Sequence, residues 1–129
     1  MQQVAGDARR FSGMRVLVVE DEALVAQLTE DMLIGLGCSV VLASGVEAAI
    51  RLIEADAFGM ALLDVNLRGK PIYPVAQALE RRAVPFVFVT GYGAAAVHAD
   101  YRDRPILGKP FAVHDLHRAI AGAVVAAPV

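Results

Sequence analysis

Short apolar runs alternate along the chain with longer segments in which apolar residues recur at helical spacing. Runs of this length that are rich in Val, Ile and Phe predict β-strands. Three of them, at 15–19, 60–63 and 86–89, are apolar almost throughout, which is typical of strands buried on both faces of a parallel sheet. Less uniform runs at 39–43 and 105–107 complete a predicted set of five strands.

Helical patterns fill the segments between these runs. In the first of them an apolar residue recurs at every fourth position, and Gly37 follows as a common helix end. The recurring residues are Leu24, Leu28, Met32 and Leu36. Before the second helix, Ser44 is a candidate N-cap, and Glu47 three residues later completes a capping-box pattern. The predicted helices cover about 24–36, 46–55, 75–82, 94–101 and 112–124.

This alternation of strands and helices predicts right-handed crossovers and a three-layer α/β sandwich around a parallel sheet. Two doubly wound sheet orders are common, and the flavodoxin-like order with five strands suits a chain of 129 residues. In either order, ligands bind beyond the carboxyl ends of the strands. We therefore expect the functional site at that edge of the sheet.

The composition is that of one folded domain. Hydrophobic residues make up 57% of the chain and charged residues 20%, a balance that excludes disorder. The net charge of −2 gives no general reason to bind nucleic acid, so no direct DNA binding is predicted. Cys38 is the single cysteine and lies in an apolar run, which favours a buried thiol in a reducing compartment.

The sequence also predicts where the domain begins and ends. Residues 1–13 are expected to be a short leader and residues 14–127 the folded domain. The leader has no apolar segment of the kind found in secretory signals. No apolar stretch approaches the roughly 20 residues that cross a bilayer. A cytoplasmic protein without a membrane anchor is therefore expected.

Polar side chains stand at the ends of otherwise apolar strands. Glu20 and Asp21 follow the first predicted strand, and Asp64 ends the third. Thr90 ends the fourth strand, and Lys109 lies just beyond the fifth. Because parallel strands end at a common edge, we expect these side chains to meet there. Clustered carboxylates repel one another, so either a pKa is raised or a cation joins them.

Oxygen ligands of this kind select a hard divalent cation, Mg²⁺ or Mn²⁺. The cluster suits phosphoryl transfer, which requires positioning and neutralisation of negative charge. Asp64 is then the nucleophile that forms an acyl phosphate, while Lys109 and the Thr90 hydroxyl contact phosphoryl oxygens. The Lys109–Pro110 peptide is a candidate cis bond. The predicted metal ligands are Glu20, Asp21, Asp64 and the backbone carbonyl of Asn66.

Four motifs occur in order along the chain: Val-Leu-Val-Val-Glu-Asp-Glu at 16–22, Leu-Leu-Asp-Val-Asn-Leu at 62–67, Val-Thr-Gly at 89–91 and Gly-Lys-Pro-Phe at 108–111. Together they resemble the receiver domain of two-component response regulators. The resemblance implies the strand order 2-1-3-4-5. It also implies that a sensor histidine kinase or a histidine phosphotransfer protein donates the phosphoryl group. The implied catalysis is limited to the domain's own phosphorylation and dephosphorylation, so it is not expected to be an enzyme.

The stretch Pro-Phe-Val-Phe-Val-Thr-Gly-Tyr-Gly at 85–93 resembles a single-domain subgroup with a Phe-x-Thr-Gly-Tyr motif, known mainly from alphaproteobacterial stress signalling. This resemblance implies a stand-alone receiver that signals by protein contact to an unidentified downstream protein. The chain departs from the family at Ile106, where most receivers carry a Tyr or Phe that rotates inward as the threonine moves. Tyr92, between two flexible glycines, is the predicted substitute. The expected switch residues are therefore Thr90, Tyr92 and Ile106.

Two features leave alternatives open. Arg68 and Lys70 either steer an acidic partner or a phosphate, or are simply solvated, and solvation is the simpler interpretation. The stretches 94–97 and 119–127 are rich in apolar residues. They indicate either a homodimer through the face formed by the fourth helix, fifth strand and fifth helix, or burial of alanine-rich helices.

Other functions fit the chain less well. A phosphohydrolase resembling the haloacid dehalogenase class needs a second Asp two residues after the first, where this chain has Asn66. A flavin carrier is disfavoured because the acidic run 20–22 would repel the cofactor phosphate. A docking module that works without phosphorylation stays open, because Ile106 leaves the usual switch incomplete. A phosphate sink is a further alternative.

Overall fold

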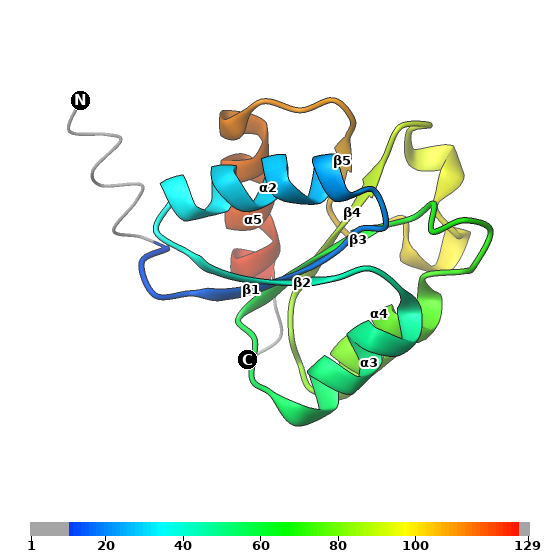
Figure 1. Ribbon diagram of the computed structural model, residues 1–129. Coiled ribbons are helices and arrows are strands. Elements are labelled where there is room, and N and C mark those ends of the chain that lie inside the picture. Colours follow the sequence, from blue (N-terminus) through cyan, green and yellow to red (C-terminus); the bar gives the residue numbers. More distant parts are fainter. Residues whose placement is uncertain (1–10, 127–129) are drawn as a thin grey trace.

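The computed structural model describes residues 11–126, in which five parallel strands form one sheet (Figure 1). The strands are β1 (Arg15–Val19), β2 (Ser39–Ala43), β3 (Met60–Asp64), β4 (Phe86–Thr90) and β5 (Ile106–Gly108). They lie in the order β2-β1-β3-β4-β5, so the predicted flavodoxin-like order is confirmed. Asp64 and Thr90 end β3 and β4, as predicted.

Helices cover both faces of this sheet, as a parallel sheet requires (Figure 1). The described residues include four α-helices: α2 (Ala23–Gly35), α3 (Val46–Ala55), α4 (Tyr73–Arg81) and α5 (Val113–Ala126). Alternate residues of β1 show how the core is divided. Leu17 and Val19 pack on the side of α3 and α4, whereas Val16 and Val18 pack on the side of α2 and α5. The predicted three-layer sandwich is therefore confirmed.

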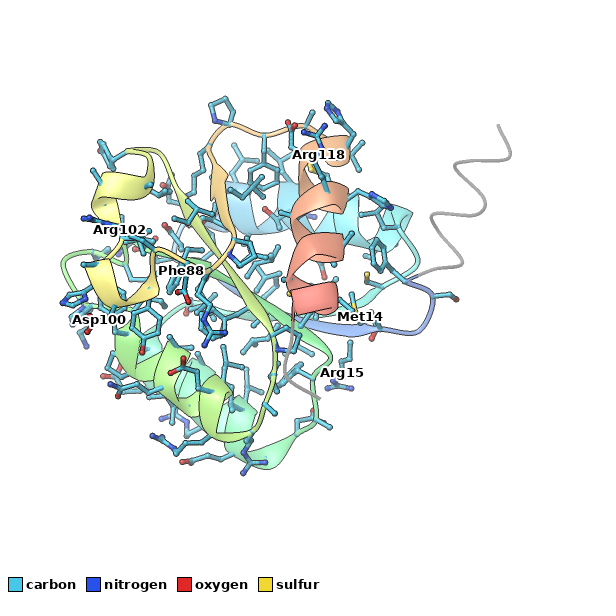
Figure 2. All side chains as sticks on the ribbon, turned by 180° about the vertical axis from the view of Figure 1, so that it is seen from behind. Met14, Arg15, Phe88, Asp100, Arg102 and Arg118 are labelled. Atoms are coloured by element: carbon cyan, nitrogen blue, oxygen red, sulfur yellow. The ribbon has the colours of Figure 1, made fainter. Side chains whose placement is uncertain are left out.

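The predicted helix over 94–101 is wrong. Two 3₁₀ turns, η1 (Ala94–Ala96) and η2 (Ala99–Tyr101), take its place. Within 94–100 only Val97 is buried, so the segment has no apolar stripe to hold a longer helix against the sheet. Asp100 N also donates a hydrogen bond to Nδ1 of His98, a local contact that competes with helical pairing. Tyr101 instead anchors the segment, with its ring centroid 5.6 Å from that of Phe88. Figure 2 shows Phe88 beside the turns that carry Asp100 and Arg102.

In α2, the residues that face the core are not those of the predicted leucine row. Leu24 and Leu28 are 72% and 51% exposed, while Ala26, Thr29 and Leu33 are buried. A spacing of four residues exceeds the helical repeat, so such a row drifts by about 40° at each step around the helix. The row therefore starts on the solvent side of α2 and reaches the core only at its end.

The predicted capping box at the start of α3 is also wrong. Gly45, not Ser44, is the N-cap residue, and no side-chain hydrogen bond caps the helix. Glu47 instead forms an ion pair with Lys70, with 3.4 Å between its Oε2 and the lysine Nζ. Helix α3 begins where Val46 and Ala49 can pack into the core. Burial of these side chains, rather than a capping hydrogen bond, therefore determines where the helix begins.

The packed part of the chain begins before residue 14. Phe11 is buried in the same core as Leu116 and Ile120. Residues 1–10 of the predicted leader lie outside the described residues. Across 11–126, no helix combines the length and apolar character that crossing a membrane requires. Cys38 is buried and forms no disulfide, in agreement with the prediction of a buried thiol.

Candidate functional site

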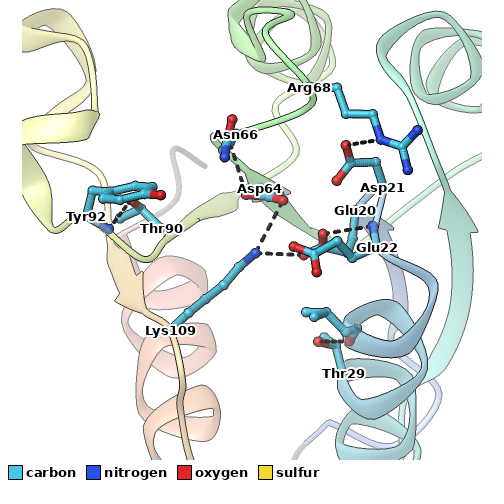
Figure 3. A network of polar contacts seen from close by, with 11 residues as sticks. Glu20, Asp21, Glu22, Thr29, Asp64, Asn66, Arg68, Thr90, Tyr92 and Lys109 are labelled. Carbon is cyan, nitrogen blue, oxygen red and sulfur yellow. Dashed lines mark hydrogen bonds and ion pairs between the residues drawn. The ribbon is translucent and has the colours of Figure 1, made fainter.

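The carboxyl edge of the sheet brings the predicted polar residues together (Figure 3). Glu20 follows β1, and Glu20 N donates a hydrogen bond of 3.0 Å to the carbonyl oxygen of Ala43. Lys109 follows β5, and its backbone N donates to the carbonyl oxygen of Thr90 over 2.9 Å. Sheet hydrogen bonding therefore continues past the strands and fixes the backbone from which these side chains project.

Three carboxylates meet at this edge. One oxygen of each of Glu20, Asp21 and Asp64 lies within 4.8 Å of the others. Glu20 and Asp64 are only 6% and 3% exposed, although charged side chains are seldom buried without a partner. The predicted convergence of residues from distant parts of the sequence is found in the structure.

Lys109 provides the opposing charge. Its Nζ lies 3.0 Å from Oε1 of Glu20 and 3.3 Å from Oδ2 of Asp64 (Figure 3). The side chain is 21% exposed, so these pairs are shielded from solvent far better than surface ion pairs. The ammonium group is in direct contact with the carboxylate that the sequence predicts as the nucleophile.

The close packing of these charges shifts their proton affinities. Burial, followed by the contact with Asp64, raises the pKa of Glu20 from 4.5 to about 7, whereas the hydrogen bonds from Lys109 and Glu22 N act to lower it. Burial by itself lowers the pKa of Lys109, but the hydrogen bond to Glu20 and the charge of Asp64 outweigh it, so the lysine pKa is raised. The predicted rise in a carboxyl pKa is thus present.

Local turns aim the side chains into the site. Asn66 N donates to Oδ1 of Asp64 over 3.0 Å, and Tyr92 N donates to Oγ1 of Thr90 over the same distance. Glu22 N donates to Oε2 of Glu20 over 3.2 Å. Each bond joins a side chain to the backbone two residues on and so restricts its rotamer. The Lys109–Pro110 peptide is cis.

The three predicted switch residues differ in how deeply they are buried. Thr90 is buried, whereas Tyr92 is 76% exposed beside it (Figure 3). Ile106 is half-buried and packs against the core on the side of α3 and α4. Close to this side, Tyr101 stacks on Tyr73 with 5.4 Å between the ring centroids and 13° between the planes. The sequence interpretation missed this stack, because no spacing rule links two tyrosines on separate elements.

Arg68 and Lys70 are exposed, as solvation predicts, yet both form ion pairs. Arg68 Nε lies 3.1 Å from Oδ2 of Asp21 (Figure 3). Lys70 Nζ lies 3.4 Å from Oε2 of Glu47, outside the carboxylate cluster. The contact between Arg68 and a predicted metal ligand was missed from the sequence, because no motif in the chain specifies the turn that places Arg68.

The donor set fits a hard divalent cation. It consists of carboxylate oxygens, the ligands that Mg²⁺ prefers. When ionised, the three carboxylates carry more formal negative charge than Lys109 and Arg68 carry positive charge. Glu20, Asp21 and Asp64 could therefore hold the ion, with Asn66 beside them in the chain. That the Asn66 carbonyl is a ligand stays a prediction.

An apolar groove opens next to Lys109. It has a volume of about 340 Å³, and its walls come from α2 and from the segment that follows β5. Lys109 itself is one of the lining residues, so the groove adjoins the residue that contacts Glu20 and Asp64. The others are Val25, Leu28, Thr29, Met32, Pro110 and Phe111.

A five-stranded parallel sheet with carboxylates, a threonine and a lysine at its carboxyl edge is the arrangement that the motifs predict for a receiver. The chain belongs to this family, because the model of the response regulator receiver domain matches residues 16–121. Receiver domains in general interact with histidine kinases or phosphotransfer proteins.

Solved structures agree with this assignment. The solution structure of SdrG from Sphingomonas melonis Fr1 is 41% identical, with a TM-score of 0.79 over 88% of this chain and 97% of SdrG. The BeF3-activated conformation of SdrG gives 40% identity and a TM-score of 0.77, over 88% of this chain and 98% of that one. The receiver domain of sensor histidine kinase PA1611 from Pseudomonas aeruginosa PAO1, solved with magnesium in its active-site cleft, is 25% identical. Its TM-score is 0.75, over 89% of this chain and all of that domain (100%).

Curated proteins show the same family in longer chains. The transcription factor SKN7 of Saccharomyces cerevisiae is 30% identical over 111 residues, which are 81% of this chain and 18% of SKN7. A probable transcriptional regulator, ycf27 of Porphyra purpurea, is 31% identical over 80 residues, 61% of this chain and 33% of that protein. The chain thus spans a third or less of these relatives.

Proposed function

We propose that the chain is a stand-alone response regulator receiver that takes a phosphoryl group onto Asp64 in a reaction dependent on a divalent cation. The donor is the phosphohistidine of a sensor kinase or of a histidine phosphotransfer protein. The contact of Asp64 Oδ2 with Lys109 Nζ at 3.3 Å, inside a cluster of three carboxylates, is the observation that carries this proposal. A nucleophilic carboxylate and a cation for the phosphoryl oxygens then stand side by side.

The residues of the site have distinct roles in the transfer. An oxygen of Asp64 attacks phosphorus, the P–N bond to the donor imidazole breaks, and the imidazole leaves with the bond electrons and takes up a proton. Lys109 shifts from the carboxylates to a phosphoryl oxygen, and the Thr90 hydroxyl donates a hydrogen bond to another. Glu20, Asp21 and Asp64 would hold a divalent cation, which would supply positive charge to offset the repulsion between carboxylate and phosphoryl group.

The groove beside Lys109 is the proposed docking site for the donor. The phosphohistidine has to approach Asp64 from the open carboxyl edge, and this groove adjoins that edge. Leu28 lines it at 51% exposure, and Leu24 extends the same apolar side of α2. An exposed apolar surface next to a reactive group is a feature of partner recognition, and a donor helix with an apolar stripe would cover it.

The phosphorylated domain is proposed to signal by contact with a downstream protein in the cytoplasm, without acting as an enzyme on other substrates and without contacting DNA. SdrG, whose chain this sequence covers to 97%, supports the stand-alone form. A homodimer through β5, α5 and the turns at 94–101 remains a prediction. The groove of about 410 Å³ between β5 and α5 supports contact at that face.

Intact mass spectrometry tests phosphoryl transfer directly. The wild type and Asp64→Asn are incubated with acetyl phosphate and Mg²⁺, because the amide keeps the shape of the side chain but is a poor nucleophile. Addition of one phosphoryl mass to the wild type and none to the variant is expected. Equal addition to both proteins, or none to either, would overturn the proposal.

Ile106 favours a second candidate, a docking module that binds its partner without phosphorylation. A half-buried aliphatic side chain stands where most receivers have the rotating aromatic ring. The two candidates differ in what Asp64→Asn does to partner binding. A docking module keeps full affinity in this variant, whereas a phosphorylation-dependent receiver loses the gain in affinity that acetyl phosphate produces in the wild type.

A further inference from the structure

The loop between β3 and α4 holds Arg68 in a fixed place above the carboxylates. Arg68 and Gly69 both have positive φ, 51° and 82°, and Lys70 N donates to the carbonyl oxygen of Leu67 over 3.0 Å. Two central residues with positive φ define a tight type I′ turn. Leu67 is 4% exposed and ties this turn to the core, so the Arg68 backbone cannot swing away from the site.

The Arg68 side chain contacts the outermost of the three carboxylates. Its Nε lies 3.1 Å from Oδ2 of Asp21, whose side chain is 11% exposed. Lys109 meanwhile pairs with Glu20 and Asp64. Each carboxylate of the cluster therefore has a cationic side chain within contact distance, and a metal ion has to share or displace these partners.

We infer that Arg68 competes with the divalent cation for Asp21 and so lowers the affinity of this receiver for its metal. This inference rests on the proposed function, since it assigns a role to a residue beside the same site. When the metal binds, Asp21 gives up the contact with Arg68, and the freed side chain moves out over the open edge.

The exposure of the pair sets the size of the effect. The Arg68 side chain is 80% exposed, and water screens such pairs strongly. Removing the charge should therefore tighten Mg²⁺ binding roughly 1.4- to fivefold, the range that measured surface ion pairs span.

Calorimetric titration of Mg²⁺ into the full chain measures this affinity without reference to phosphorylation. Arg68→Gln removes the charge at similar length, and Arg68→Asn does so with a residue that adopts positive φ more readily. Arg68→Lys keeps the charge. Lys70→Gln is the matched control, because it removes a positive charge two residues away that pairs with Glu47, outside the metal cluster.

Both neutral Arg68 variants are expected to bind Mg²⁺ more tightly, while Arg68→Lys and Lys70→Gln stay near the wild type. In wild-type spectra, the Arg68 Nε–H resonance should shift as Mg²⁺ is added. Unchanged or weaker binding by the neutral variants, or an equal gain in Lys70→Gln, would overturn the role of Arg68 but leave the proposed function standing. A wild type that binds no divalent cation would overturn both.

Discussion

Replacing Glu20 with Gln should remove a pH dependence of stability that the clustered carboxylates create. Burial and the neighbouring Asp64 raise the pKa of Glu20 from 4.5 to about 7 in the folded protein. Between these two values the folded chain holds a proton that the unfolded chain has released. Protons therefore stabilise the fold in this window, and that stability is lost as the pH rises through about 7.

The size of the effect follows from the shift in pKa. The pKa of Glu20 in the folded protein differs from its ordinary value, and each unit of that difference corresponds to about 1.36 kcal/mol. The free energy of unfolding therefore changes by about 3 kcal/mol at most. Because the Glu20 side chain is only 4% exposed, solvent screening reduces this free-energy change only slightly. Against a typical domain stability of about 5–15 kcal/mol, the loss is large enough to measure.

Urea unfolding in the presence of EDTA, at about pH 5 and about pH 8, is the appropriate assay. The wild type should lose about 2–3 kcal/mol of unfolding free energy over this interval, whereas Glu20→Gln should lose much less. Glu47→Gln is the matched control, because Glu47 is exposed and should keep the wild-type slope. Stability that increases with pH in the wild type, or a slope that persists in Glu20→Gln, would refute this reasoning.

Three further predictions concern the metal, the lysine and the groove. Because Mg²⁺ and a proton compete for Glu20, Mg²⁺ binding measured by calorimetry should tighten about tenfold between about pH 6 and about pH 8, and this gain should vanish in Glu20→Gln. Lys109→Gln should slow phosphorylation by acetyl phosphate about 100-fold in a mass-spectrometric time course, since it removes the cation beside Asp64; an unchanged rate would exclude the proposed role. Leu28→Ser should slow transfer from a phosphorylated histidine phosphotransfer protein about fivefold, followed by radiolabel, as an interface contact of about 1 kcal/mol is lost. Phosphorylation by acetyl phosphate is its control, and slowing of both reactions would argue against docking in the groove.

The carboxyl-edge cluster could be predicted because it depends on topology rather than on fine packing. Once parallel strands are recognised from their apolar runs, any polar residue at a strand end has to lie at the shared edge. Asp64 and Lys109 are 45 residues apart in number, yet the order of the sheet alone brings them together. The raised pKa of Glu20 then follows from burying like charges side by side.

The features that escaped prediction depend on side-chain packing, which a linear pattern does not encode. The segment 94–101 has alanines of high helix propensity, yet too few buried residues to hold a longer helix. The leucine row of α2 has a plausible spacing, but the drift of the row decides which members face the core. The ion pair of Arg68 with Asp21 needs a turn of defined geometry, which no motif in the chain specifies.

The most direct measurement maps where the phosphoryl group is attached. After incubation with acetyl phosphate, borohydride reduction converts an aspartyl phosphate to homoserine, and peptide mass spectrometry then identifies the position. We predict homoserine at position 64 when Mg²⁺ is present and none when EDTA replaces it. Modification at another acidic residue, or at Asp64 irrespective of the cation, would contradict the assignment of this edge as a metal-dependent phosphoacceptor site.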